Sequence, residues 1–221
     1  TVTVLYYVTT LTVPSFDLGN IGQSFKDFAA IEGRKILVHG GGKLATRLAE
    51  KLEIKQQMID GRRVTDKATL DVVTMVYAGL INKRIVAMLQ SLGCNAIGLS
   101  GADGGVIRAN RRSPEPIDFG FVGDIAEVDG KRLQTLTNDG FTPVICSIMH
   151  DGNGNLLNCN ADSVASGVAA GMAREEATEL IFCFDKAGVL SDVNDPTTLI
   201  PQITAETYPS LKAEGVVSAG M

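Results

Sequence analysis

The sequence has few residues that could bind a metal ion or form a disulfide. Its 221 residues include four cysteines and two histidines, and no two cysteines form a Cys-x-x-Cys pair. Cysteines that bind zinc normally occur in such closely spaced pairs. We therefore expect no metal site and four buried free thiols, which are typical of a reducing compartment. The four thiols are Cys94, Cys146, Cys159 and Cys183.

The sequence also lacks an excess of positive charge and a long uninterrupted apolar run. Lys and Arg number 20 against 25 Asp and Glu, which gives a net charge of −5 and disfavours nucleic-acid binding. Residues 1–13 are apolar and β-branched, but they have no basic stretch or cleavage site of a signal peptide, so we predict a strand there. No apolar run approaches the roughly 20 residues that a membrane span needs. We expect a soluble, cytoplasmic protein that binds neither nucleic acid nor membranes.

Strand-like runs alternate with helix-like runs along most of the chain, a pattern typical of βαβ units around a parallel sheet. The pattern predicts an α/β protein, a three-layer α/β/α sandwich with a mostly parallel central sheet. Turn-forming residues at 110–130 predict a surface hairpin. The predicted strands are 2–13, 35–38, 96–99, 143–148 and 180–184. The predicted helices are 23–31, 43–52, 68–90, 131–139, 161–172 and 205–213.

The stretch "KILVHGGGKLATRLAEKL", residues 35–52, joins a predicted strand to a predicted helix through Gly40, Gly41 and Gly42. Glycines let a backbone approach an anion closely, and free N–H groups at a helix start point toward it. We therefore predict a cradle for phosphate or carboxylate, and a simple tight turn is the alternative. The spacing fits neither the GxGxxG nor the GxxxxGK[ST] pattern.

Two further polar segments are candidates for substrate binding. "DGRRVTD" places Arg62 and Arg63 before the long helix, where an arginine fork suits a carboxylate, and a solvated pair is the alternative. "LLNCNADSVA" gathers Asn158, Asn160 and Asp162 within five residues. A helix N-cap is the alternative role for Asp162, but a cap does not require two neighbouring amides.

Two predicted strands end in glycine-containing turns. "LIFCFDKAGVL", residues 180–190, ends in Asp185 to Gly188, and ligands of open α/β sheets bind at the carboxyl ends of strands. "GLSGADGG", residues 98–105, has the same arrangement, and a plain loop is an equal alternative there.

Taken together, these segments resemble the acetylglutamate kinases of the amino acid kinase family over residues 27–221. The resemblance implies an open α/β/α sandwich, a homodimer, and transfer of the γ-phosphoryl group of ATP to the side-chain carboxylate of an N-acylated glutamate in arginine biosynthesis. The matching motifs are "VHGGGKLATRL", "GRRVTD", "MVYAGLINKRIVAMLQ", "GLSGADGG", "DFGFVGDI", "GFTPVICSI", "LLNCNADSVA", "CFDKAGVL" and "GVVSAGM".

The resemblance also implies roles for individual residues. Gly41 and Gly42 would offer N–H groups to the acceptor carboxylate and the moving phosphoryl group. Arg63 and Asn158, with Asn160 beside them, would hold the α-carboxylate end of the substrate. Asp162 would orient catalytic lysines without transferring a proton. Mg²⁺ would be bound through the ATP phosphates, with few direct protein ligands. The residues that would lie along ATP are Asp185, Lys186, Ala187, Gly188, Val189, Leu190, Val216, Val217 and Ser218.

The sequence departs from the family pattern at two places. Family members carry Lys-x-Gly-Gly at the end of the first strand, but here Tyr6, Tyr7, Thr9 and Thr10 occupy that region. The family also has a second catalytic lysine beyond the position of Met221. We expect the printed sequence to be a truncated and locally misassigned piece of a single kinase domain. Its acylglutamate-binding lobe would span about 1–155 and its nucleotide-binding lobe about 156–221. A nonfunctional remnant, or another group in place of the lysine, is the alternative.

Two alternative functions follow. The motifs define the glutamate end of the substrate better than the acyl group, so the acceptor could be N-succinylglutamate. The two absent lysines also favour a relative that binds these ligands without turnover. Glutamate 5-kinases and aspartokinases share the fold, but "GRRVTD" and "NCNAD" resemble them less.

Overall fold

The structure is a computed structural model that describes residues 6–11, 18–59, 62–183, 188–192 and 194–217. Those residues form two compact units, 1–182 and 183–221. We describe each unit by itself. The lobe boundary predicted near residue 155 separates two ligand-binding regions. The division into compact units does not test ligand binding, so this boundary stays a prediction.

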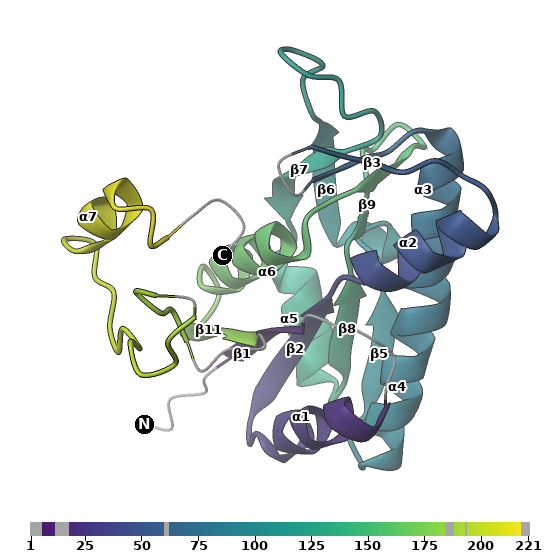
Figure 1. Cartoon of the computed structure of the whole chain (residues 1–221). Coiled ribbons are helices and arrows are strands. Elements are labelled where there is room, and N and C mark those ends of the chain that lie inside the picture. The colour runs from purple at the N-terminus through teal and green to yellow at the C-terminus, as the bar shows by residue number, and fades with distance from the viewer. Residues whose placement is uncertain (1–5, 12–17, 60–61, 184–187, 193, 218–221) are drawn as a thin grey trace. The chain divides into compact units, whose positions relative to one another are not determined.

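The first unit is built on a mostly parallel five-stranded sheet (Figure 1). β1 pairs with β2, β2 with β8, and β8 with β5, all in parallel. Such pairing requires crossover connections, and helices of the chain provide them. The strand order is β11 (Thr178–Cys183), β1 (Tyr6–Leu11), β2 (Arg34–His39), β8 (Thr142–Cys146) and β5 (Ala96–Leu99).

Helices cover both faces of this sheet. α4 (Asn82–Ser91) packs on β5 and β8, and α1 (Leu18–Ala30) packs beside α4. On the opposite face, α6 (Ala161–Met172) packs on β1 and β2, and α5 (Gly130–Asn138) packs on β8 and against α6. The predicted three-layer α/β/α arrangement is therefore confirmed.

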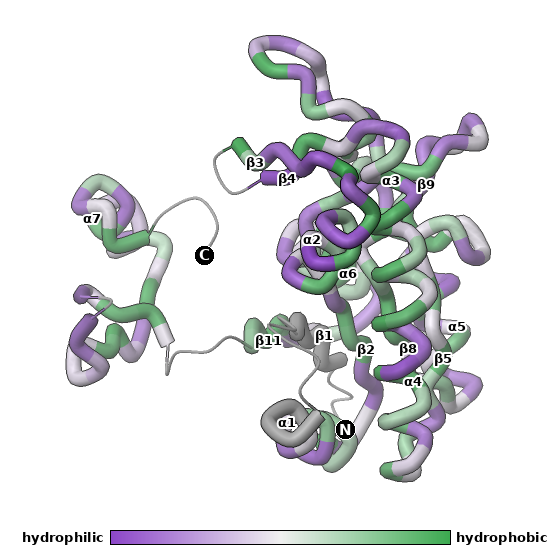
Figure 2. The backbone as a smooth tube through the Cα atoms, turned by 45° about the vertical axis from the view of Figure 1, so that its right-hand side comes forward, coloured by the Kyte–Doolittle hydropathy of each residue, from purple (hydrophilic) through white to green (hydrophobic). Residues whose placement is uncertain are grey.

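The side chains of β2 alternate between the helix layers on the two faces of the sheet. Ile36 and Val38 belong to the buried cluster that α5 and α6 cover, whereas His39 contacts Asn82 of α4. Both faces of the strand are therefore buried, as the nearly continuous apolar run "KILVH" indicates. Figure 2 shows this hydrophobic character along the middle of β2.

The long apolar run forms one continuous helical segment, Lys67–Ser91. It contains α3 (Lys67–Thr74), a π-helical stretch (Met75–Ile81) and α4. Its most apolar window has a mean hydropathy of 1.5 and is 44% buried, so by length and composition alone it could cross a membrane. Core helices of soluble proteins pass the same test. The prediction of a helix is confirmed. Asp71, Lys83 and Arg84 interrupt the apolar residues of this segment, so it contains no uninterrupted apolar run of about 20 residues.

A second, four-stranded sheet contains the predicted hairpin. β6 (Ile107–Arg111) and β7 (Gly123–Val128) pair antiparallel, which confirms the hairpin. Four short strands were not predicted from the sequence. They are β9 (Ile148–His150), β10 (Leu156–Asn158), and β3 (Gln57–Ile59) with β4 (Arg62–Val64), which form a two-stranded ribbon. These strands have three residues each, too few to show an alternating pattern.

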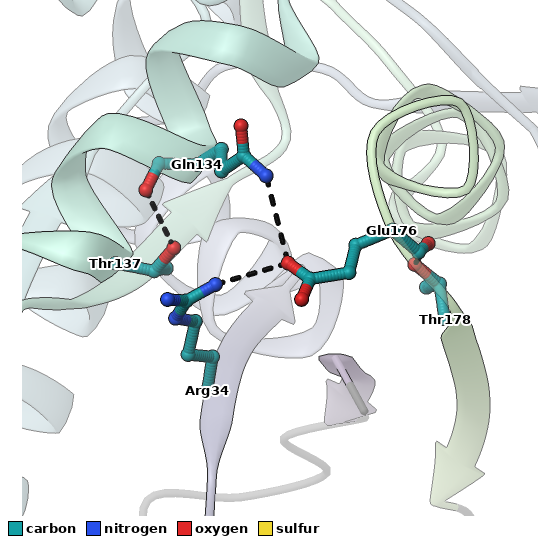
Figure 3. A network of polar contacts seen from close by, with 5 residues as sticks. All are labelled: Arg34, Gln134, Thr137, Glu176 and Thr178. Carbon is teal, nitrogen blue, oxygen red and sulfur yellow. Dashed lines mark hydrogen bonds and ion pairs between the residues drawn. The ribbon is translucent and has the colours of Figure 1, made fainter. Parts of the chain in front are cut away.

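A polar network joins β2, α5 and the connection from α6 to β11. Figure 3 shows the Arg34 guanidinium and the Gln134 amide pointing toward the Glu176 carboxylate. Arg34 Nη1 lies 2.9 Å from Glu176 Oε2, and Gln134 Nε2 lies 3.5 Å from the same oxygen. The Thr178 hydroxyl donates to the Glu176 carbonyl at 3.0 Å. These bonds fix the chain where it enters β11.

The second unit contains a single described helix, α7 (Tyr208–Ala213). This helix is shorter than the predicted 205–213, because Pro209 is tolerated only in a first helical turn. Leu190 and Leu199 form an isolated antiparallel bridge.

Three of the four cysteines are buried and all are free, but Cys183 is only half-buried, which corrects the expectation that all four are buried. In the part of the chain that the structure describes, no group of three His, Cys, Asp or Glu side chains could hold a metal ion.

Candidate active site

A cavity of about 380 Å³ opens in the first unit between the starts of α2 (Gly42–Lys51) and α6. Six residues predicted as site residues line it, although they come from three separate parts of the sequence. They are Gly41, Gly42, Arg63, Asn158, Asn160 and Asp162. The parallel sheet explains this convergence, because β2 delivers the glycine turn at its carboxyl end.

The glycine turn is held closely against the π-helical stretch. A Cβ atom at Gly41 would overlap Ile81 Cδ1 and lie 2.9 Å from Tyr77 Cδ1, so no other residue fits at position 41 without a shift of its neighbours. Gly41 is the N-cap of α2 and Gly42 is its first residue. The N-terminus of a ten-residue helix, with its partial positive charge, therefore meets the cavity.

A second helix N-terminus meets the same cavity. Asn160 is the N-cap of α6, and its Oδ1 accepts from the Ser163 N–H at 2.9 Å. The alternative reading of Asp162 as the N-cap is therefore wrong. Asp162 lies in the first turn, half-buried, and burial raises the pKa of its carboxyl. Two helix N-termini that converge on one cavity favour an anionic ligand.

Arg63 is buried and braced from several sides. Its Nη2 donates to the Gly42 carbonyl at 3.0 Å and to Thr46 Oγ1 at 2.8 Å, and its Nη1 donates to Gln56 Oε1. Three bonds leave part of the five-donor fork for a ligand. Because Arg63 is 8% exposed and α2 holds its guanidinium, the group is a preorganised site for a carboxylate.

Asn158 is linked to Arg63 through Thr65. Asn158 Nδ2 donates to Thr65 Oγ1 at 3.0 Å, and the Thr65 hydroxyl donates to the Arg63 carbonyl at 3.2 Å. The Thr65 backbone also pairs with residues 119 and 121. Gly120 allows this approach, since a Cβ there would overlap the Thr65 carbonyl oxygen. The segments around β4, β7 and β10 therefore form one hydrogen-bonded wall.

Some charged residues of the wall were not predicted from the sequence. Lys43 and Arg112 line the cavity with Arg62 and Asp124. Arg112 Nε donates to Asp124 Oδ2 at 3.0 Å, and this hydrogen bond lowers the pKa of the Asp124 carboxyl. Four cationic residues face two anionic ones, which suits a ligand with more than one negative charge. The position of Lys43 after the glycines could have indicated its role, whereas Arg112 lies far away in sequence.

The neutral part of the wall includes Met58, Tyr77, Val122 and Cys159. Burial raises the pKa of the Tyr77 hydroxyl, and the nearby Arg63 charge only partly offsets this effect. Burial also raises the pKa of the Cys159 thiol to about 12. A thiol with such a pKa is neutral at pH 7 and is a poor nucleophile.

The predicted nucleotide-binding residues belong to the second unit. Gly188, Val189, Leu190, Val216 and Val217 are described, whereas Asp185, Lys186, Ala187 and Ser218 lie outside the described residues. The Ile200 N–H donates to the Val189 carbonyl at 2.8 Å. Their role stays a prediction. The segment 98–105 lines no part of the cavity. Asp103 Oδ2 accepts there from the Ser100 N–H at 2.6 Å, as in a structural turn.

Known proteins share both the sequence and the fold. An acetylglutamate kinase of Bacteroides fragilis is 50% identical over 201 residues, which cover 91% of this chain and 77% of the relative. One from Methanopyrus kandleri is 41% identical over 207 residues, 92% of this chain and 83% of the relative. The crystal structure of smu.665 from Streptococcus mutans has a TM-score of 0.78 at 25% identity and covers 97% of this chain and 85% of that one.

A second solved structure shares the fold alone. Giardia carbamate kinase has a TM-score of 0.66 at 10% identity, with 100% of this chain and 85% of that one covered. The sequence profile described as "Amino acid kinase family" matches residues 11–221. The glycine turn, the buried arginine and the second helix N-terminus all lie within that match, and the chain belongs to the amino acid kinase family.

Proposed function

We propose that the chain is an acetylglutamate kinase, which transfers the γ-phosphoryl group of ATP to the side-chain carboxylate of N-acetyl-L-glutamate in arginine biosynthesis. The observation that carries this proposal is the cavity in which a braced arginine and two helix N-termini lie together. Relatives with 41% and 50% identity that bear this name support it.

The two ends of an acylglutamate match two parts of the cavity. The α-carboxylate binds Arg63, whose fork is held by Gly42 and Thr46, and Asn158 and Asn160 bind the same end of the substrate. The side-chain carboxylate binds at the starts of α2 and α6. Because both anchors are fixed before binding, the acceptor oxygen is aligned at little entropic cost.

The reaction needs no general base. A carboxylate is already ionised at pH 7, so one of its oxygens forms the new bond to the γ-phosphorus while the bond from phosphorus to the bridging oxygen breaks. ADP leaves with that electron pair. The N–H groups of Gly41 and Gly42 stabilise the negative charge on the transferred phosphoryl group. Asp162 orients cationic groups toward the phosphates, and Lys43 is the lysine that lines the cavity with it.

ATP is the second substrate, as in other kinases. Segments 185–190 and 216–218 would hold it. Mg²⁺ bound to its phosphates would neutralise their charge.

We further propose that the protein is a cytoplasmic homodimer. Met75 and Leu80 are 55% and 39% exposed on the long apolar helix. Exposed apolar residues on such a helix suit a face that a second copy covers in a two-fold symmetric contact.

The experiment that tests the function separates turnover from binding. Asp162→Asn removes the negative charge that orients the cationic groups, so we expect kcat to fall roughly 100-fold or more. Binding of N-acetylglutamate, measured by calorimetry, should change less than about threefold, because Arg63 and Asn158 are retained. Asp139→Asn, at an exposed position on the far end of α5, is the matched control and should keep full activity.

The same experiment decides between the proposal and its alternatives. A wild-type protein that binds acylglutamate but releases no ADP would be a binding relative, and a preference for N-succinylglutamate would identify a different acceptor. The names of the relatives favour neither outcome.

A further inference from the structure

The residue that precedes the glycine turn, His39, has no role in the mechanism above. It is the last residue of β2 and is 0% exposed. Its ring lies between Gly40 and the buried Asn82 at the start of α4. A buried imidazole with two defined partners next to a catalytic turn has a specific orientation, and that orientation can be worked out from the partners.

Asn82 determines which ring nitrogen carries the proton. Its Nδ2 lies 2.9 Å from the Val144 carbonyl oxygen, which can only accept, and the Lys83 ammonium donates to its Oδ1 at 3.1 Å. These two partners assign the amide orientation. Nδ2 therefore also donates to His39 Nε2, 3.1 Å away. Because Nε2 accepts, a neutral ring carries its proton on Nδ1.

The Nδ1–H group then donates to the Gly40 carbonyl oxygen at 2.9 Å. That oxygen and the Gly41 N–H belong to one trans peptide unit, in which they point in opposite directions. The Gly41 N–H consequently points away from the imidazole. Gly41 lines the cavity, and none of the residues that the structure describes accepts a hydrogen bond from its N–H.

A peptide between two glycines is easily inverted, because neither residue has a Cβ that restricts φ and ψ. Inversion of the Gly40–Gly41 peptide would direct a carbonyl oxygen at the bound anion and remove one donor. Contacts of Gly41 with Ile81 and Tyr77 restrict its position, but the hydrogen bond from His39 is the one polar contact among the described residues that fixes the Gly40 carbonyl.

We propose that His39 is a positioning residue that holds the Gly40–Gly41 peptide so that the Gly41 N–H faces the transferred phosphoryl group. The inference rests on the proposed kinase function. Burial, with the nearby Lys83 charge, lowers the pKa of His39 to about 4. The ring therefore stays neutral at pH 7 and keeps the single arrangement that Asn82 assigns.

Two substitutions of similar polarity separate this role from packing. Asn places an amide nitrogen where His39 has Nδ1, whereas Gln reaches the Nε2 position and leaves the Nδ1 donor absent. We expect His39→Gln to lower kcat roughly 100-fold, as loss of one such donor does, with a change in KM below about threefold. His39→Asn should retain kcat within about fivefold, because the donor is rescued.

Leu37→Ala is the matched control, because Leu37 is equally buried on the same strand. It should weaken the fold but keep kcat, so a loss of kcat in His39→Gln could not be ascribed to stability. Equal losses in His39→Gln and His39→Asn would overturn the proposal.

A readout that does not depend on turnover completes the test. The chain has only two histidines, so ¹⁵N NMR of labelled imidazoles can assign the proton of His39 directly. We expect a protonated Nδ1 and a bare Nε2, unchanged between pH 6 and 8. A proton on Nε2 would overturn the proposal even in an active enzyme. If the wild-type protein releases no ADP, the kinase function fails, whereas the NMR result still reports the orientation of the turn.

Discussion

Burial shifts the pKa values of two residues near the glycine turn, the basic His39 and the acidic Asp162, in opposite directions. His39 is held neutral, since burial lowers the pKa of its ring to about 4. Asp162 is half-buried, and burial raises the pKa of its carboxyl. In each case the environment disfavours the charged form. His39 therefore adds no charge beside the anion site. The reaction also does not use it as a general base.

The pKa of His39 predicts how stability depends on pH. The unfolded ring titrates near 6.5 and the folded ring near 4, so the unfolded state binds more protons between these values. The buried neutral His39 therefore makes its full contribution to the free energy of unfolding above pH 6.5. That contribution is lost as the pH falls toward 4, by about 3 kcal/mol in total. Denaturant unfolding at pH 7 and pH 5 should show a loss of stability that is smaller in His39→Asn. Equal losses in both proteins would contradict this account.

Arg63 should be irreplaceable by lysine. A lysine keeps the charge but cannot reproduce the bonds to Gly42 and Thr46 while it also binds a carboxylate. We expect Arg63→Lys to raise KM for N-acetylglutamate roughly 10- to 100-fold, with a smaller effect on kcat. Steady-state kinetics measure both values. Arg47→Lys, at an exposed position of α2, should match the wild type, and an unchanged KM in Arg63→Lys would remove Arg63 from the substrate site.

At the scale of elements, the long helix Lys67–Ser91 supports the glycine turn as well as the core. Tyr77 and Ile81 of its π-helical stretch contact Gly41, and Asn82 contacts His39. π-helical turns occur often at functional sites. The apolar spacing at 68–90 predicted a helix, but it could not predict the π-helical turns. Such turns hold one more residue than α-helical turns, and where they form depends on tertiary contacts.

The close contact at Gly41 can be tested by adding one methyl group. Gly41→Ala would place a Cβ against Ile81 and Tyr77, and overpacking of this kind costs about 1–3 kcal/mol. We expect a corresponding fall in the free energy of unfolding and a loss of activity. Gly79→Ala is the control within the same helical segment, since nothing lies within 4 Å of a Cβ there. It should be neutral or slightly stabilising. A fully active Gly41→Ala would show that the contact is not needed.

The boundaries of elements could be predicted where local signals exist. Asp66 caps α3, and its side chain accepts from the Thr69 N–H at 2.7 Å, so the predicted start of that helix is correct within a residue. The cap of α6 was harder to predict, because Asn160 and Asp162 are both suitable residues and only the fold shows that Asn160 takes the position. Arg112 could not be predicted as a cavity residue, since its place depends on the pairing of Thr65 with the hairpin.

At the scale of the whole molecule, the alternation of apolar runs was sufficient to predict an α/β/α sandwich. β2 and β8 are buried on both faces, and such strands have a distinct composition. The division into units 1–182 and 183–221 could not be predicted in the same way, because it depends on long-range contacts and not on a local change in composition.

The proposed dimer leads to a prediction about assembly. Light scattering should give a mass near twice that of the 23.4 kDa chain, and Leu80→Glu should convert the protein to a monomer, because a charge cannot be buried there without a partner. Ile117→Glu, at a residue 38% exposed on the hairpin, is the control and should remain dimeric. A monomeric wild-type protein would contradict the assignment of this face.

The measurement that tests the central claim most directly is the capture of the reaction product. The protein is incubated with ATP, Mg²⁺ and N-acetylglutamate, and hydroxylamine is added to convert any acyl phosphate to a stable hydroxamate. We predict hydroxamate in amounts equal to the ADP released, with neither product when N-acetylglutamate is omitted. ADP release without hydroxamate, or no ADP at all from protein that binds N-acetylglutamate, would contradict the account.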